Sequence, residues 1–168
     1  GITAENVAEK FQVTREDQDN FALNSQEKAL KAQKENKFKE EIVNFKIKSK
    51  KSEINFNKDE HPREGVNIEA LKRLKPVFKK DGTVTAGNAS GINDGAAVVT
   101  LMSTKEAQKR EIKKLVSIKS WASCGVEPAL MGTGPIPASK KALELAGWSI
   151  KDVDLFEINE AFAAQSIA

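Results

Sequence analysis

The second half of the chain repeats one pattern, in which a short apolar run is followed by a helix-forming segment. The apolar runs lie at 97–102, 114–123 and 153–158, and their length and content suit buried strands. Helix-forming segments follow, most clearly at 104–113 and 138–146. Because strands that alternate with helices usually pair in parallel, the pattern predicts an α/β fold with a largely parallel sheet.

The first half follows a different pattern, with a long helix and then two short alternating runs. Thr14 stands before acidic residues as the N-cap of a helix that should run to about Glu35. Apolar and polar residues alternate at 43–47 and 54–56, which predicts a hairpin with one buried face and a solvated, Lys-rich tip at 48–52. This half is therefore expected to form a separate subdomain or an insertion.

Composition excludes several classes of protein. Of the 168 residues, 39% are hydrophobic and 30% are charged, which is typical of a soluble globular protein. No apolar run approaches the ~20 residues of a membrane-spanning helix, and no signal peptide is visible, so no membrane partner is expected. The net charge of +3 is too small to predict a nucleic-acid partner. The single cysteine cannot form an internal disulfide, which fits a reducing compartment.

Two glycine-containing segments have compositions that indicate more than a connecting role. Segment 82–99 is rich in Gly, Ala, Ser and Thr, and its glycines would permit close approach to a ligand or to another stretch of backbone. Loop 125–139 holds three prolines and three glycines, which is unusual for a simple connection.

Asn159 stands where the apolar run 153–158 gives way to a small-residue helical segment. In open α/β sheets, ligands lie beyond the carboxyl ends of the strands, where helix N-termini present free N–H groups. A carboxamide can donate and accept without titrating at neutral pH. Asn159 could therefore orient a water or stabilise a developing oxyanion. A role as a simple N-cap explains the same position and stays open at this point.

Three further residues could carry chemistry, but simpler roles are favoured. Cys124 has no Lys, Arg or His beside it to activate its thiol, so it is expected to be a buried structural cysteine. His61 lies in a polar loop without an orienting partner in sequence, so it is expected at the surface. Glu160 could act as a base, although support of its neighbours is the favoured role.

Four stretches form an ordered set. They are 1–19, 81–99, 131–143 and the segment Asn-Glu-Ala-Phe-Ala-Ala-Gln at 159–165, here called the signature segment. Their sequences, order and spacing resemble the thiolase family, in its acetyl-CoA acetyltransferase branch. The sequence Met-Gly-Thr-Gly-Pro-Ile-Pro-Ala at 131–138 is similar to the short-chain, acetoacetyl-CoA version. The resemblance covers essentially the whole chain.

The resemblance implies a reaction and a fold. Thiolases join two acetyl-CoA molecules into acetoacetyl-CoA and coenzyme A, or run the reverse cleavage. One cysteine is acylated, a second acts as acid and base, and two oxyanion holes hold the thioester oxygens. The fold has two similar α/β halves and an inserted loop domain that covers coenzyme A. The resemblance implies no resident cofactor, a homodimer or homotetramer, and a cytoplasmic location, or the mitochondrial matrix in a eukaryote.

The resemblance also divides the chain. Residues 1–92 correspond to most of the loop domain, 93–113 to the end of the N-terminal half, and 114–168 to the start of the C-terminal half. In thiolases, one oxyanion hole uses a histidine from a Gly-His-Pro motif. This histidine, the acylated cysteine and the second cysteine are all expected outside these residues. The chain is therefore expected to be an internal part of a thiolase and inactive alone.

Site residues follow from the same resemblance. Asn159 matches the asparagine that holds a water in one oxyanion hole. Arg63 matches an arginine near the nucleotide, although an exposed arginine without a role stays open, and Met131 matches a methionine at the acyl end. Ala70 stands where relatives carry a serine, so one polar contact is in doubt. Further coenzyme contacts are implied for Leu74, Phe78, Ala86, Ala89, Ser90, Ala161 and Phe162.

Two alternatives from other classes stay open. A non-catalytic module could use the basic residues of the first half to bind an adenine nucleotide or RNA. The low aromatic content of 6% and the absence of tyrosine disfavour RNA. A thiolase-like coenzyme A or lipid-binding protein would share the fold without the reaction, and the flanking sequence would decide between the two.

Overall fold

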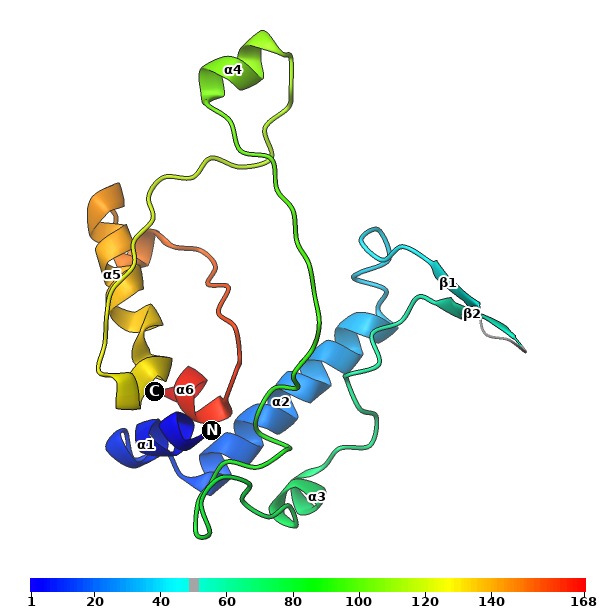
Figure 1. Cartoon of the computed structure of the whole chain (residues 1–168), viewed down its shortest axis with the longest axis vertical. Helices are drawn as coiled ribbons and strands as arrows, with labels where there is room; N and C mark the ends of the chain where they lie inside the picture. The colour runs from blue at the N-terminus through cyan, green and yellow to red at the C-terminus, as the bar shows by residue number, and fades with distance from the viewer. Residues whose placement is uncertain (49–51) are drawn as a thin grey trace. The chain divides into compact units, whose positions relative to one another are not determined.

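The computed structural model describes residues 1–48 and 52–168, which divide into two compact units (Figure 1). The first unit contains Gly1–Gly91 and Asn159–Ala168, and the second contains Ile92–Ile158. The first unit holds α1 (Ile2–Lys10), α2 (Arg15–Lys34), β1 (Phe45–Lys48), β2 (Glu53–Phe56), α3 (Ile68–Lys72) and α6 (Ala163–Ile167). The second unit holds α4 (Thr104–Lys109), the 3-10 helix η1 (Pro128–Thr133), α5 (Pro135–Ala146) and the 3-10 helix η2 (Ile150–Asp152).

Side-chain caps fix the starts of two helices in the first unit. The Thr14 hydroxyl accepts from the Asp17 amide at 3.1 Å, and the Asp17 carboxylate accepts from the Thr14 amide at 2.9 Å, which completes a capping box. The predicted N-cap of α2 and its end near Glu35 are confirmed. Asn67 caps α3 by accepting from the Ala70 amide at 2.9 Å. These local bonds fix where α2 and α3 begin.

The core of the first unit is built from small apolar residues around α6. Ala8, Val13 and Ala164 form a buried cluster, and Val84 is also fully buried. Helix α6 contacts both α1 and α2, and Figure 1 shows it beside them. Alanine side chains allow the helices to approach closely. The end of the signature segment is therefore part of the core of this unit.

The predicted hairpin is present, but its predicted buried face is not. Strands β1 and β2 pair antiparallel, with Phe45 opposite Phe56 and Ile47 opposite Ile54. These four apolar side chains share one face and are 42–67% exposed. The prediction of burial was wrong because a two-stranded ribbon cannot cover its own face. Of the predicted tip at 48–52, residues 49–51 lie outside the described part of the chain.

The three strands predicted for the second half are absent among the described residues. Segments 97–102, 114–123 and 153–158 are irregular, and apolar side chains such as Val98 (95%) and Leu115 (94%) are exposed. The prediction of three strands was wrong, because a strand forms only when the backbone of a neighbouring segment exchanges hydrogen bonds with it.

The helices predicted for the second half are confirmed with changed limits. Helix α4 follows Ser103, whose hydroxyl accepts from the Glu106 amide at 3.1 Å. Helix α5 begins at Pro135, three residues before the predicted start, because proline suits the first turn of a helix. Gly147 ends it with a φ of 69°, as predicted for a C-terminal glycine. Within the described residues, no helix is long and apolar enough to span a membrane.

Candidate functional site

The signature segment is paired through its backbone with the 88–90 segment. The Ser90 amide donates to the Ala161 carbonyl at 2.9 Å, and the Ala163 amide donates to the Asn88 carbonyl at 2.9 Å. Ala89 and Phe162 form an antiparallel bridge between these bonds. The structure therefore brings together Ala89, Ser90, Ala161 and Phe162, four of the residues selected from sequence.

A fifth selected residue meets this pair through an aromatic contact. The rings of Phe78 and Phe162 pack edge to face, with centroids 6.5 Å apart and planes at 77°. Phe78 remains 43% exposed, so part of its ring is available to a ligand. Aromatic pairs of this geometry attract each other through ring edge and ring face. The contact gives the paired backbone an apolar flank.

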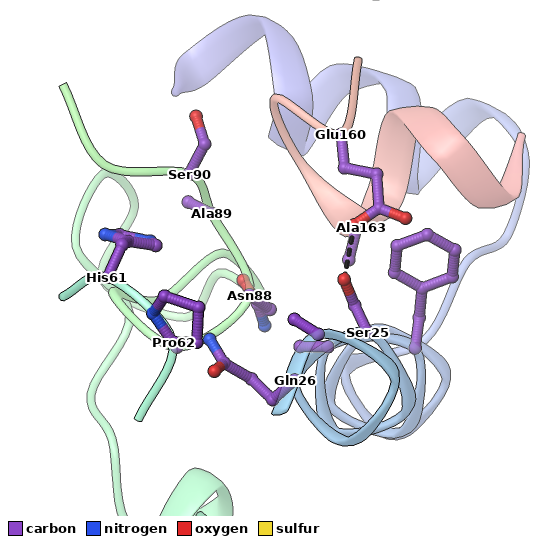
Figure 2. A pocket seen from close by; sticks show the side chains of 13 residues that line it. Ser25, Gln26, His61, Pro62, Asn88, Ala89, Ser90, Glu160 and Ala163 are labelled. Carbon is purple, nitrogen blue, oxygen red and sulfur yellow. Dashed lines mark hydrogen bonds between the residues drawn. The ribbon is translucent and has the colours of Figure 1, made fainter. Parts of the chain in front are cut away.

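An open cavity of about 200 Å³ lies between α2, the loop at 61–62 and the paired backbone (Figure 2). Figure 2 shows Ala89 and Ser90 along one part of its rim and Glu160 along another. Its lining consists of Phe21, Ala22, Ser25, Gln26, Ala29, His61, Pro62, Gly87, Asn88, Ala89, Ser90, Glu160 and Ala163.

Helix α2 contributes lining residues that were not predicted from the sequence. Ala22, Ser25, Gln26 and Ala29 recur at helical spacing, so they share one face of α2. This stripe of small and neutral polar residues in an otherwise charged helix was the available sequence signal. A face of this kind leaves room for a ligand beside the helix.

Two hydrogen bonds connect α2 to the other sides of the cavity. The Ser25 hydroxyl donates to Oε2 of Glu160 at 2.6 Å. The Arg63 amide donates to Oε1 of Gln26 at 3.0 Å. Glu160 is exposed and held by a neighbouring hydroxyl, which agrees with support of its neighbours. The Arg63 side chain is also exposed, and only its backbone is held in place.

Gly87 allows α3 and the residues after it to approach the 88–90 segment. A Cβ atom at Gly87 would lie 2.6 Å from Cδ2 of Leu71 and 2.6 Å from Cδ1 of Leu74. Carbon atoms do not approach that closely without displacement. Gly87 thus permits close approach, but of two leucine side chains and not, as was predicted, of a ligand or of another stretch of backbone. At Gly95 there is no close approach, because a Cβ there would meet nothing within 4 Å.

The remaining selected residues lie at the surface of their units. Asn159 is exposed, and the N-cap of α6 is Phe162, so the alternative that Asn159 is only an N-cap was wrong. Ala86 is exposed shortly before the paired backbone in sequence, and Leu74 is exposed and lies against Gly87. Met131 belongs to the second unit, in η1, and is 63% exposed. Its predicted contact with the acyl end stays a prediction.

The other residues considered for a chemical role, Cys124 and His61, are exposed. Cys124 is exposed, so the prediction that it is a buried structural thiol was wrong. The irregular segment before it, 114–123, is mostly exposed and does not cover it. His61 is exposed, as predicted, although it also lines the cavity. Across the described residues, no group of three or more His, Cys, Asp and Glu side chains could hold a metal ion.

Comparison with known proteins matches both parts of the chain. The family model described as "Thiolase, N-terminal domain" matches residues 1–105, and "Thiolase, C-terminal domain" matches residues 112–168. An acetyl-CoA acetyltransferase of Rhizobium meliloti is 58% identical over 168 residues, which cover 100% of this chain and 43% of that protein. The cytosolic acetyl-CoA acetyltransferase of Mus musculus is 57% identical, again over 100% of this chain and 43% of that protein.

Solved structures agree with the sequence matches. The acetyl-CoA acetyltransferase of Bacillus anthracis superposes with a TM-score of 0.92 at 51% identity, over 98% of this chain and 42% of that chain. Human mitochondrial 3-ketoacyl-CoA thiolase gives a TM-score of 0.88 at 42% identity, over 99% and 42%. The chain thus spans less than half the length of the relatives that it matches, and the fold predicted from sequence, part of a thiolase α/β fold, is confirmed. The chain belongs to the thiolase family.

Proposed function

We propose that the natural protein, meaning the complete protein in which this sequence occurs, is an acetyl-CoA C-acetyltransferase. It would condense two acetyl-CoA molecules to acetoacetyl-CoA and coenzyme A, or catalyse the reverse thiolysis. The names of the relatives support this reaction class. The observation that carries the proposal is the backbone pairing of the signature segment with the 88–90 segment, because both segments hold residues with a proposed coenzyme contact.

In this proposal, the pantetheine arm of the thioester lies along the paired backbone. The exposed part of the Phe78 ring, which packs against Phe162, supplies an apolar surface for the arm. The exposed guanidinium of Arg63 attracts the phosphates of the nucleotide end, while its backbone stays bound to Gln26. Pocket contacts are assigned to Leu74, Phe78, Ala86, Ala89, Ser90, Ala161 and Phe162.

Asn159 acts on the charge that develops during acyl transfer. Attack on a thioester carbonyl places negative charge on its oxygen, and a fixed donor lowers the energy of that state. The Asn159 carboxamide supplies an uncharged donor, either directly or through a water that it holds. Its exposed position ahead of α6 leaves it free to face a substrate rather than to cap the helix.

The proposal extends to the properties of the natural protein. It requires no resident cofactor, because coenzyme A enters as part of the substrate. We place the protein in the cytoplasm as a homodimer or homotetramer, with residues 1–92 covering coenzyme A. Residues 1–168 alone are expected to be inactive. They contain one cysteine, the exposed Cys124, and no Gly-His-Pro sequence. Thiolysis by this mechanism needs a nucleophile and an acid/base that act as a unit.

Thiolysis of acetoacetyl-CoA by the purified natural protein tests the proposal. We expect consumption of acetoacetyl-CoA that depends on free coenzyme A, and a rise in thermal stability when coenzyme A is added. Stabilisation by coenzyme A without turnover would instead support a non-catalytic thiolase-like binding protein. Absence of both responses would overturn the proposal, and salt-dependent retention on an oligonucleotide would favour the nucleic-acid alternative.

A further inference from the structure

Asp19 is a fully buried carboxylate on α2 that the proposed chemistry does not use. Its side chain has no exposed surface, and Asp19 is not among the residues that line the cavity. A buried carboxylate destabilises a fold unless it is paired and hydrogen-bonded. Each of its two oxygens accepts a hydrogen bond, Oδ2 from Arg15 at 2.8 Å and Oδ1 from Asn88 at 3.0 Å.

The Arg15 partner continues from Asp19 to the end of α3. One terminal nitrogen of Arg15 donates to the Leu71 carbonyl at 2.8 Å and to the Leu74 carbonyl at 2.9 Å. Carbonyls at the C-terminal end of a helix lack partners within the helix, so a cation there stabilises the helix. Asp19 fixes the direction of the guanidinium and, through it, the position of Leu74.

The Asn88 partner continues from Asp19 to the paired backbone. Asn88 is 3% exposed, and its amide nitrogen also donates to the Thr83 carbonyl at 3.0 Å. Its Oδ1 atom accepts from the Thr85 amide at 2.8 Å. Its backbone carbonyl accepts from the Ala163 amide at 2.9 Å, next to the bridge that involves Phe162. The orientation of Asn88 therefore determines where the 88–90 segment meets the signature segment.

We propose that Asp19 is a positioning residue for the coenzyme A thioester. From a single buried carboxylate, it holds two groups of proposed coenzyme contacts in register: Leu74 on one side, and Ala89 and Ser90 on the other. One oxygen fixes the α3 side through Arg15, and the other fixes the 88–90 side through Asn88. This inference rests on the proposed function for the identity of the ligand. A pocket fixed before binding loses less conformational freedom when the ligand enters, so Asp19 strengthens binding without touching the ligand.

Asp19→Asn tests the inference with almost no change in size. Whichever way the new amide turns, its NH2 group faces a donor, either Arg15 or Asn88, so one of the two connections is lost. We expect the KM for coenzyme A in thiolysis by the natural protein to rise about tenfold, while kcat changes less than about threefold. If the substitution only destabilised the protein and left binding unchanged, neither the KM nor kcat would rise.

An exchange variant separates positioning from general damage. In the double variant Asp19→Asn/Asn88→Asp, the carboxylate at 88 accepts from the amide at 19, and the amide oxygen accepts from Arg15. The total charge is unchanged, but the ion pair with Arg15 becomes a hydrogen bond to a neutral oxygen, and the bond to the Thr83 carbonyl is lost. We expect the KM of the exchange variant to lie below that of Asp19→Asn. An exchange variant that binds no better than both single variants would contradict the inference.

Arg15→Lys serves if Asp19→Asn does not fold. The Arg15 side chain is 25% exposed, and lysine keeps the charge but cannot reach Asp19 and both carbonyls at once. We expect a raised KM with a Tm close to that of the wild type. The matched control is Glu35→Gln at the C-cap of the same helix, because the exposed Lys31–Glu35 pair at 3.9 Å is outside the cavity lining. Its KM should not change.

Wild-type turnover is measured first, so that the two proposals can fail separately. If the wild type turns over acetoacetyl-CoA and both Asp19→Asn and Arg15→Lys keep its KM, the positioning role is overturned and the function stands. If the wild type neither binds coenzyme A nor turns over, the proposed function fails. Amide hydrogen exchange then decides the structural coupling: Asp19→Asn should speed exchange in peptides with Ser90 and Ala163, and unchanged exchange overturns the inference.

Discussion

The hydroxyl of Ser25 donates a 2.6 Å hydrogen bond to Oε2 of Glu160, although the two residues are 135 positions apart in the chain (Figure 2). Glu160 follows Asn159 and precedes Ala161, whose carbonyl accepts from the Ser90 amide. The bond therefore connects the middle of α2 to the first residues of the signature segment. It restrains the backbone that carries the proposed catalytic asparagine.

Ser25→Ala should lower the kcat of the natural protein more than it raises the KM for acetyl-CoA. Without the hydroxyl, Glu160 is free to move, and the adjacent Asn159 becomes less well positioned. Because Glu160 is exposed, the effect should be modest, roughly threefold. Steady-state kinetics measure it, with Ser25→Thr as the control that keeps a hydroxyl. An unchanged kcat in the alanine variant would show that the bond has no functional role.

Asn159→Asp should impair catalysis far more than coenzyme A binding. A carboxylate repels the oxyanion that develops in the transition state, and loss of one such donor reduces transition-state stabilisation by roughly 3–4 kcal/mol. A reduction of kcat by two to three orders of magnitude is the expected scale. Titration calorimetry with coenzyme A supplies the control, because its Kd should hardly change. Kinetics in which only KM rises would exclude this role for Asn159.

Arg63→Ala should raise the KM for acetyl-CoA and leave kcat near normal. The bond from Arg63 to Gln26 uses the backbone amide, so alanine preserves it and removes only the charge. The nucleotide end is remote from the reacting carbonyl, so the contact stabilises ground state and transition state alike. Lys58→Ala, which breaks an exposed ion pair with Glu64, is the control in the same loop. Equal KM values at low salt for Arg63→Ala and the wild type would leave Arg63 as a surface residue.

Structure that is set by neighbours in the chain could be predicted from the sequence. The Thr14 cap and the glycine that ends α5 were predicted because their partners lie within a few residues. Asp19 pairs locally with Arg15, but its second partner lies 69 positions away, and the partners of Ser25 and Gln26 lie 135 and 37 positions away, so the roles of all three were missed. No local pattern in a sequence marks such pairs. The family resemblance supplied Ala89 and Phe162, whose pairing no periodicity would predict.

The strand predictions show a different limit. An apolar run indicates that a segment is suited to burial. Segment 97–102 has this composition, although Val98 is exposed. A strand forms only when two segments pair. A segment can therefore have the composition of a strand and still lack a pairing partner among the residues present. The hairpin of β1 and β2 formed because its partner follows directly in sequence.

Gly87→Ala should destabilise the natural protein by about 1–3 kcal/mol, because the new methyl group would overlap the side chains of Leu71 and Leu74. Urea denaturation measures the loss. Gly95→Ala is the matched control, since a Cβ there meets nothing within 4 Å and the change should cause no loss. If the two alanine variants unfold at the same urea concentration, α3 is not packed on Gly87 as the structure has it.

Asp17→Asn should change the acid sensitivity of α2. The hydrogen bonds from the Thr14 hydroxyl and then the Thr14 amide lower the pKa of Asp17 below its ordinary value of 3.8. A carboxylate whose pKa is lowered by folding stabilises the fold fully above its unfolded pKa, and that contribution is lost as the pH falls through the folded pKa. At neutral pH, the Tm of the wild type should therefore be higher than that of Asp17→Asn, and this difference should shrink below about pH 3.8. Glu16→Gln, in the same turn but outside the capping box, is the control for the helix dipole. A difference in Tm that stays constant from pH 7 into the acid range would show that the Asp17 charge does not strengthen the cap.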